Sequence, residues 1–156
     1  MAYSVEAGLG WKLITWTIKK VNPMNDKTTQ AQRLAHWHQL IGARDLAQLD
    51  TALAEDAVMH SPIVHHPLVG KTIVIKYLSA AFHVFLNDDF HYLRECLSDN
   101  SAILEFETTI DGIYVNGVDM IRWNQNGLID DFKVMVRPIK AVNLIHQKMA
   151  LLLGQT

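Results

Sequence analysis

Four strand-like segments follow one another in the second half of this 156-residue sequence, and this pattern restricts the fold more than any other feature. They begin after Asn87-Asp88-Asp89 and are separated by turn signals at Asp99-Asn100, Asp111-Gly112 and Asn126-Gly127. Asp-Gly and Asn-Gly pairs favour tight hairpins, so neighbouring segments are expected to pair as an antiparallel meander.

The alternation of apolar and polar residues within these segments predicts which face of the sheet is buried. In residues 101–110, apolar and polar side chains alternate, with Glu105 and Glu107 on the polar face. Successive side chains of a strand point to opposite sides, so the apolar ones share one face of the sheet. That face carries Leu104 and Phe106 in this segment and Phe132 and Val134 in the last one.

The first half of the chain has the three- and four-residue apolar spacing of helices. The predicted elements are helices over residues 29–41, 45–53 and 72–86 and a strand over 57–61. Gly42 is expected to end the first helix, Asp45 and Thr72 to cap the other two, and Pro62 to stop the strand. Helices followed by a sheet predict an α+β domain.

Composition excludes several classes of protein. Apolar residues make up 49% and charged residues 19%, which is typical of a globular domain with its own core. The net charge is −2, and Lys and Arg form no cluster, which argues against nucleic-acid binding. Cys96 is the single cysteine, so an internal disulfide is excluded and a reduced, cytoplasmic compartment is expected.

The N-terminal stretch 9–21 mixes Trp and Ile with lysines. It is too short to span a bilayer, and Glu6 stands where a signal peptide has basic residues, so no membrane association is expected. We predict an extension over residues 1–25, disordered or loosely docked, followed by one domain over residues 26–156.

Three segments together resemble nuclear transport factor 2-like proteins. They are LAEDAVMHSP at 53–62, Gly70 before an amphipathic helix, and a meander that ends in GLIDDFK at 127–133. The resemblance implies a cone-shaped α+β barrel, in which a curved, mostly antiparallel sheet is wrapped by helices around an apolar pocket. It also implies a homodimer formed through the outer sheet face. The superfamily includes ketosteroid isomerases, SnoaL-like cyclases, limonene epoxide hydrolases and non-catalytic proteins, so the fold does not fix the reaction.

Asp119 is the strongest catalytic candidate because alternation places it on one face with Ile121 and Trp123. If that face lines the pocket, loss of solvent raises the pKa of the carboxyl and makes it an acid, a base or a hydrogen-bond donor. The resemblance assigns it the oxyanion-binding role of an isomerase aspartate. The alternative is a bulge near Gly117 that turns Asp119 toward water, or pairing with Arg122 at the rim.

Two other isomerase positions differ in this sequence. The second oxyanion donor of those enzymes, a tyrosine on the first helix, corresponds to Trp37, whose indole N–H donates but exchanges no proton. Their general base, an aspartate before the proline that ends the first strand, corresponds to Ser61. Because a serine without an activating base does not remove a carbon-bound proton at neutral pH, the known steroid isomerase mechanism is not expected.

His38 and His60 are candidate substitute bases because histidine titrates near neutral pH, although alternation puts His60 on the face opposite Ser61. The arrangement of limonene epoxide hydrolases, in which an arginine bridges two acids around a water, is matched only at Asp119, because Arg122 and Asp131 alternate to the other face.

The expected ligand is a small apolar molecule, and no cofactor is expected because the sequence carries no phosphate-binding loop and no cysteine pair for zinc. The predicted ligand-lining residues are Ser61, Tyr77, Leu104, Phe106, Ile121, Trp123, Phe132 and Val134. His60, His65 and His66 match no metal-site spacing, so no metal is predicted. Cys96 is expected to be buried, and Met120 and Met135 are expected to join Trp123 in an apolar sheet patch.

Three functions remain open. The first is an isomerase, cyclase or hydrolase that uses Asp119 on an apolar substrate, which requires a second titratable group within hydrogen-bond reach. The second is a non-catalytic binder, which needs only shape and one polar anchor. The third is a dimeric protein-interaction module, which shows a filled interior and an exposed apolar face.

Overall fold

The computed structural model describes residues 23–154, which form four α-helices, one short 3-10 helix and a six-stranded sheet. The extension predicted over residues 1–25, including the stretch 9–21, lies outside the described residues as far as residue 22. In the described part of the chain, no helix is long and apolar enough to cross a membrane.

The order of elements follows the predicted pattern of helices and then sheet. The elements are α1 (Pro23–Ala43), η1 (Leu46–Gln48), α2 (Leu49–Ala52), β1 (Leu53–His60), β2 (Leu68–Val69), α3 (Lys71–Phe85), β3 (His91–Leu97), β4 (Ser101–Ile110), β5 (Ile113–Trp123), β6 (Ile129–Arg137) and α4 (Ile139–Leu153). The four predicted meander strands are therefore confirmed as β3 to β6. At the β4–β5 turn, Asp111 and Gly112 both have positive φ, as a tight two-residue hairpin requires.

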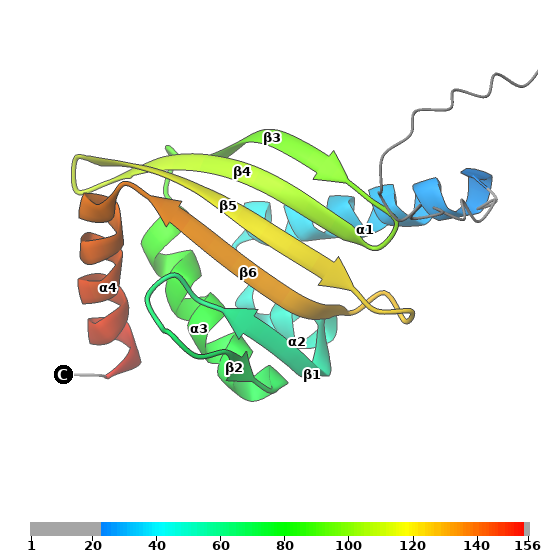
Figure 1. Cartoon of the computed structure of the whole chain (residues 1–156), viewed down its shortest axis with the longest axis horizontal. Helices are drawn as coiled ribbons and strands as arrows, with labels where there is room; N and C mark the ends of the chain where they lie inside the picture. Colours follow the sequence, from blue (N-terminus) through cyan, green and yellow to red (C-terminus); the bar gives the residue numbers. More distant parts are fainter. Residues whose placement is uncertain (1–22, 155–156) are drawn as a thin grey trace, which may run out of the picture.

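The six strands form one curved sheet in the order β2-β1-β6-β5-β4-β3. All neighbours are antiparallel except β1 and β6, which run parallel. Figure 1 shows α1 and α3 on one side of the curved sheet and α4 at the end where β6 stops. The predicted helix-wrapped, mostly antiparallel sheet is confirmed, and the sheet is open rather than a closed barrel.

The helices and the inner sheet face enclose an aromatic core. Trp37 of α1 packs against Phe132 of β6 and Phe82 of α3, with ring centroids 5.2 Å and 6.2 Å apart. From β4, Phe106 adds a further ring next to Phe85 of α3. The concave face of the sheet is therefore covered by side chains from helices that the sequence places before it.

Several predicted boundaries were wrong. Gly42 lies inside α1, which continues to Ala43. Asp45 caps the 3-10 turn η1 by accepting a hydrogen bond from the Ala47 amide, and Leu53 already belongs to β1. Gly70, not Thr72, precedes α3, and it forms no side-chain cap. Apolar spacing predicts where helices and strands occur but not where they end. Their ends depend on tertiary contacts, which a local sequence pattern does not contain.

Two side chains were predicted on the wrong side. Cys96 is exposed, because its register partner Ile103 lies on the outer face of the sheet. Trp123 is buried on the inner face, so the outer apolar patch contains Met120 and Met135 without it.

Gly117 on β5 permits a close contact between the core and the sheet backbone. A methyl group added there would lie 2.3 Å from the Phe106 ring and 2.8 Å from the Met135 carbonyl oxygen. Both distances are far inside van der Waals contact, so any side chain displaces the ring.

We expect Gly117→Ala to destabilise the fold by about 1–3 kcal/mol, the usual cost of overpacking a core. The measurement is the free energy of unfolding in urea, and Gly42→Ala is the matched control because nothing lies within 4 Å of its added methyl group. Equal stability of the Gly117→Ala variant and the wild type would contradict the tight contact.

Candidate functional site

Asp119 lies in the middle of β5, between Leu104 of β4 and Val134 of β6. Only 7% of its surface is exposed. The β4–β5 register is continuous past Gly117, so the alternative of a bulge that turns this carboxyl toward water does not hold. The side chain points to the concave inner face, among apolar neighbours.

A chain of two hydrogen bonds ends on this carboxyl. The Trp37 indole N–H donates to the Tyr92 hydroxyl over 3.0 Å, and the Tyr92 hydroxyl donates to Asp119 Oδ2, also over 3.0 Å. The three side chains come from α1, β3 and β5, which are far apart in sequence. Asp119 Oδ1 has no hydrogen-bond partner among residues 30–154.

Next to Asp119 is a small cavity of about 40 Å³. Its walls are otherwise aliphatic or aromatic side chains and the indole of Trp37. The lining residues are Trp37, Ile41, Leu78, Ala81, Phe82, Phe85, Leu86, Phe90, Phe106, Asp119, Phe132 and Val134. Asp119 is the only titratable group in this set, so it alone gives the cavity its polarity.

Burial raises the pKa of Asp119 to about 7, and the hydrogen bond from Tyr92 opposes this rise. Burial also raises the pKa of Tyr92 well above its ordinary value, with a further contribution from the charge of Asp119. Tyr92 therefore stays protonated and acts as a donor, whereas Asp119 changes charge near neutral pH. The Oδ1 oxygen of Asp119 therefore donates a hydrogen bond into the cavity when the carboxyl is protonated, and accepts one when it is ionised.

The candidate bases lie away from this cavity. His38 is next to Glu95, with 2.8 Å between Nε2 and Oε1, and its ring contacts the outer side of Tyr92. His60 lies 3.3 Å from Asp131 on the opposite face of the sheet. Ser61 is buried, and its hydroxyl accepts a hydrogen bond from the Ile63 amide. None of the three is among the residues that line the cavity.

The other predicted ligand-lining residues divide into three groups. Phe106, Phe132 and Val134 line the cavity beside Asp119. Tyr77, Leu104 and Ile121 are buried in the surrounding core instead. Trp123 lines a different, more open pocket at the far side of Trp37.

Tyr92 was missed by the sequence reasoning, although it is the direct partner of Asp119. The strand that carries it is mostly exposed, so it lacks a clean alternating pattern. A register shift between Tyr92 and Arg94 further disturbs the period of two. The available signal was an aromatic residue with a polar tip at the start of a predicted strand, a residue type that usually finds a partner when buried.

A metal or cofactor site has little support in the described residues. No cluster of three or more His, Cys, Asp or Glu side chains between residues 23 and 154 is arranged to hold a metal ion. His65 and His66 contact each other edge to face at the surface, and neither ring pairs with a carboxylate of residues 30–154.

Comparison with known proteins gives a family and a set of similar structures. Residues 34–132 match the family model of the SnoaL-like domain. No curated protein matches the sequence significantly. A crystal structure of a steroid delta-isomerase from Pseudomonas aeruginosa is 38% identical, with a TM-score of 0.76, and the match covers 81% of this chain and 92% of that one.

Two further structures carry no assigned activity. A bacterial protein with a cystatin-like fold from Silicibacter pomeroyi is 28% identical, with a TM-score of 0.71, over 76% of this chain and 83% of that chain. An NTF2-like protein from Mesorhizobium loti is 19% identical, with a TM-score of 0.63, over 74% of this chain and 97% of that one. At 19% identity, the similarity to the Mesorhizobium loti protein shows only a shared fold.

We expect Tyr92→Phe to raise the pKa of Asp119 further, by about one unit, since it removes the hydrogen bond that favours the ionised carboxylate. The pKa is measured from the pH dependence of the Asp119 carboxyl carbon shift by NMR. Tyr114→Phe is the matched control, because the Tyr114 hydroxyl donates to Glu107 on the outer face. An unchanged or lowered pKa of Asp119 in the Tyr92→Phe variant would show that the hydrogen bond is not formed.

Proposed function

The chain belongs to the SnoaL-like domain family, and we propose that it is a small-molecule pocket protein that binds a compact apolar carbonyl compound beside Asp119. One observation carries this proposal: a single carboxyl with a pKa of about 7 opens into a cavity whose other walls lack titratable groups. In its protonated form, Asp119 donates a hydrogen bond to the carbonyl oxygen and polarises it.

The hydrogen-bond chain supports this role because it fixes the carboxyl. Tyr92 occupies Oδ2, and the Trp37 N–H in turn orients the Tyr92 hydroxyl. Oδ1 is then the oxygen available to a ligand. A fixed donor in a dry cavity needs little reorganisation when it meets a carbonyl, and this makes the interaction stronger than it is in water.

The size of the cavity favours a compact ligand. About 40 Å³ holds a few water molecules, far less than the several hundred Å³ of a drug-sized site. The aromatic side chains of the cavity walls pack favourably against flat or cyclic apolar groups. A ketone on a single ring fits these limits better than a large polycyclic molecule does.

Isomerase activity is the second candidate, favoured by the 38% identity to a steroid delta-isomerase. With no base at Ser61, Asp119 itself would act in its ionised form. It would take the proton from the carbon between the carbonyl and the double bond, leaving the electron pair in a dienolate. It would then return the same proton to the far carbon of the double bond, so the atoms balance and the carboxylate is regenerated.

We expect the affinity for cyclohexanone, measured by calorimetry, to be constant below pH 7 and to fall about tenfold per pH unit above the pKa of Asp119, because ionisation removes the donor. In Asp119→Asn the dependence on pH should disappear, since the amide does not titrate in this range. The control variant Asp88→Asn changes an exposed acid that pairs with Arg44, and its affinity should keep the pH dependence of the wild type.

Catalysis is tested separately with cyclohex-3-enone, whose conversion to the conjugated enone is followed by ultraviolet absorbance. Turnover that Asp119→Asn abolishes and Asp88→Asn preserves supports the isomerase. Binding of cyclohexanone without turnover supports the non-catalytic binder. If the wild type shows neither binding nor turnover, or binds independently of pH, the proposed role of Asp119 is wrong.

We further propose a homodimer through the outer face of β4, β5 and β6. Ile103 is paired with Met120 and Val118 with Met135, so the four side chains form one apolar strip, in which Ile103 is 47% and Met135 52% exposed. A strip of this kind complements its own copy across a two-fold axis.

We expect Met135→Lys to convert the dimer to a monomer, because a charge added to the apolar strip would be buried without a partner in the interface. The measurement is molar mass by light scattering. Leu151→Lys on α4, at a residue that is 76% exposed, is the control and should leave the mass unchanged. A wild type that is already monomeric at micromolar concentration would leave the third function, an apolar face for a different protein, as the better explanation of the strip.

A further inference from the structure

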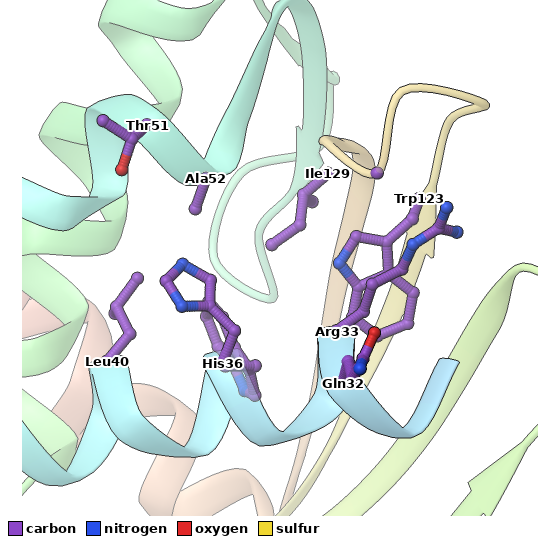
Figure 2. A pocket seen from close by; sticks show the side chains of 10 residues that line it. Gln32, Arg33, His36, Leu40, Thr51, Ala52, Trp123 and Ile129 are labelled. Carbon is purple, nitrogen blue, oxygen red and sulfur yellow. The ribbon is translucent and has the colours of Figure 1, made fainter. Parts of the chain in front are cut away.

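A second pocket lies on the side of Trp37 away from Asp119. It measures about 260 Å³ and lies between α1, the end of α2 and the turn that joins β5 to β6. Figure 2 shows its labelled side chains projecting from these elements around a common space. The lining residues are Gln32, Arg33, His36, Trp37, Leu40, Thr51, Ala52, Trp123, Gly127 and Ile129. Trp37 is the only residue that this pocket shares with the Asp119 cavity.

Trp123 presents an unused donor to this pocket. Its residue surface is 3% exposed, and its indole N–H forms no hydrogen bond with residues 30–154. In that range only Gln30 Oε1 is a buried side-chain polar atom without a partner, so the Trp123 N–H still reaches the open space of the pocket. In Figure 2 the indole nitrogen of Trp123 points into the pocket. A tryptophan N–H that faces a pocket can exchange its hydrogen bond to water for one to an acceptor on a ligand. The pocket therefore lacks an acceptor at this position.

The charges around the pocket favour an anion. Arg33 and His36 form no ion pair with residues of the described chain, and no carboxylate is among the lining residues. Two acids of the adjoining segments form ion pairs with other cations, Asp50 with Lys71 and Asp130 with Arg122. The pocket thus has cationic and N–H donors without internal acceptors for them.

Arg33 is held in place by the turn. Its Nε lies 3.3 Å from the position that a side chain would take at Gly127, so the glycine leaves room for the guanidinium against the turn backbone. Gly127 also has φ +78°, a conformation that the turn needs and that glycine adopts without strain. The guanidinium is therefore positioned at the rim, near the residue that carries the unpaired indole N–H.

The remaining walls are apolar. Leu40 is fully buried, and Ile129 and Trp37 are each 2% exposed, so they form a rigid floor for a flat hydrocarbon group. From these observations we propose that the pocket is a second ligand site, which binds a small aromatic carboxylate. Its ring lies on the apolar floor, and its carboxylate accepts hydrogen bonds from Trp123 and Arg33.

The probe is 2-naphthoate, titrated into the full chain by calorimetry. We expect one site per chain and at least about tenfold weaker binding to Arg33→Gln, which loses a charge-assisted hydrogen bond. Arg44→Gln is the matched control, since Arg44 lies beyond the other end of α1 and pairs with Asp88. The neutral amide 2-naphthamide should also bind at least about tenfold more weakly than the carboxylate.

The location of binding is read from the indole N–H signals of the tryptophans by NMR, with the Trp123 signal assigned from Trp123→Phe. A downfield shift of that signal on addition of 2-naphthoate supports the proposal. Equal affinity of wild type and Arg33→Gln, or an unshifted Trp123 signal at saturation, overturns it. Asp119→Asn should bind 2-naphthoate as the wild type does, so failure of this site and failure of the Asp119 cavity are distinguishable.

Discussion

Ten residue pairs join β4 to β5 without interruption, from Ser101↔Arg122 to Ile110↔Ile113, and this register decides which side chains enter the interior. Because side chains alternate along a strand, a shift of one residue would exchange the two faces. Asp119 would then face solvent, and the outer Met120 would enter the core. The contact between Gly117 and Phe106 makes such a shift still more costly, since only glycine leaves room for the ring. The position of the carboxyl is therefore a property of the whole hairpin.

A carboxyl in this position works against the stability of the fold at neutral pH. Burial favours its neutral form, and the Tyr92 hydrogen bond returns only part of the lost hydration. The three side chains of the polar chain nevertheless depend on one another: without Tyr92, both the Trp37 N–H and the carboxyl would lose their partner. Asp119 Oδ1 is the one oxygen of this polar chain without a partner among residues 30–154, and water or a ligand in the cavity can complete its hydrogen bonding.

The sequence was informative where one residue pattern decides the outcome. The hairpin signals and the alternation in β4 predicted the sheet, and alternation in β5 was enough to place Asp119 inside. Tyr92 could not be found in this way, because its strand is exposed on most positions and shifts its register beside it. His38 and His60 were candidate bases by residue type, but their partners Glu95 and Asp131 come from other elements, and no local pattern shows those contacts. The second pocket was missed for the same reason, since α1 and the β5–β6 turn meet only in three dimensions.

The parallel pairing of β1 with β6 has a consequence for how the chain is made. The strands β3 to β6 pair with their neighbours in sequence and can form as soon as each hairpin is complete, whereas β1 has only the two-residue β2 beside it until β6 exists. On the ribosome, Leu53, Ala57 and Met59, all buried in the finished protein, therefore leave the exit tunnel long before their partner strand is synthesised. Closing so long a loop is slow compared with closing a hairpin. The first strand in the sequence is thus the last to be hydrogen-bonded fully into the sheet. During synthesis it is therefore the segment that most needs protection from aggregation.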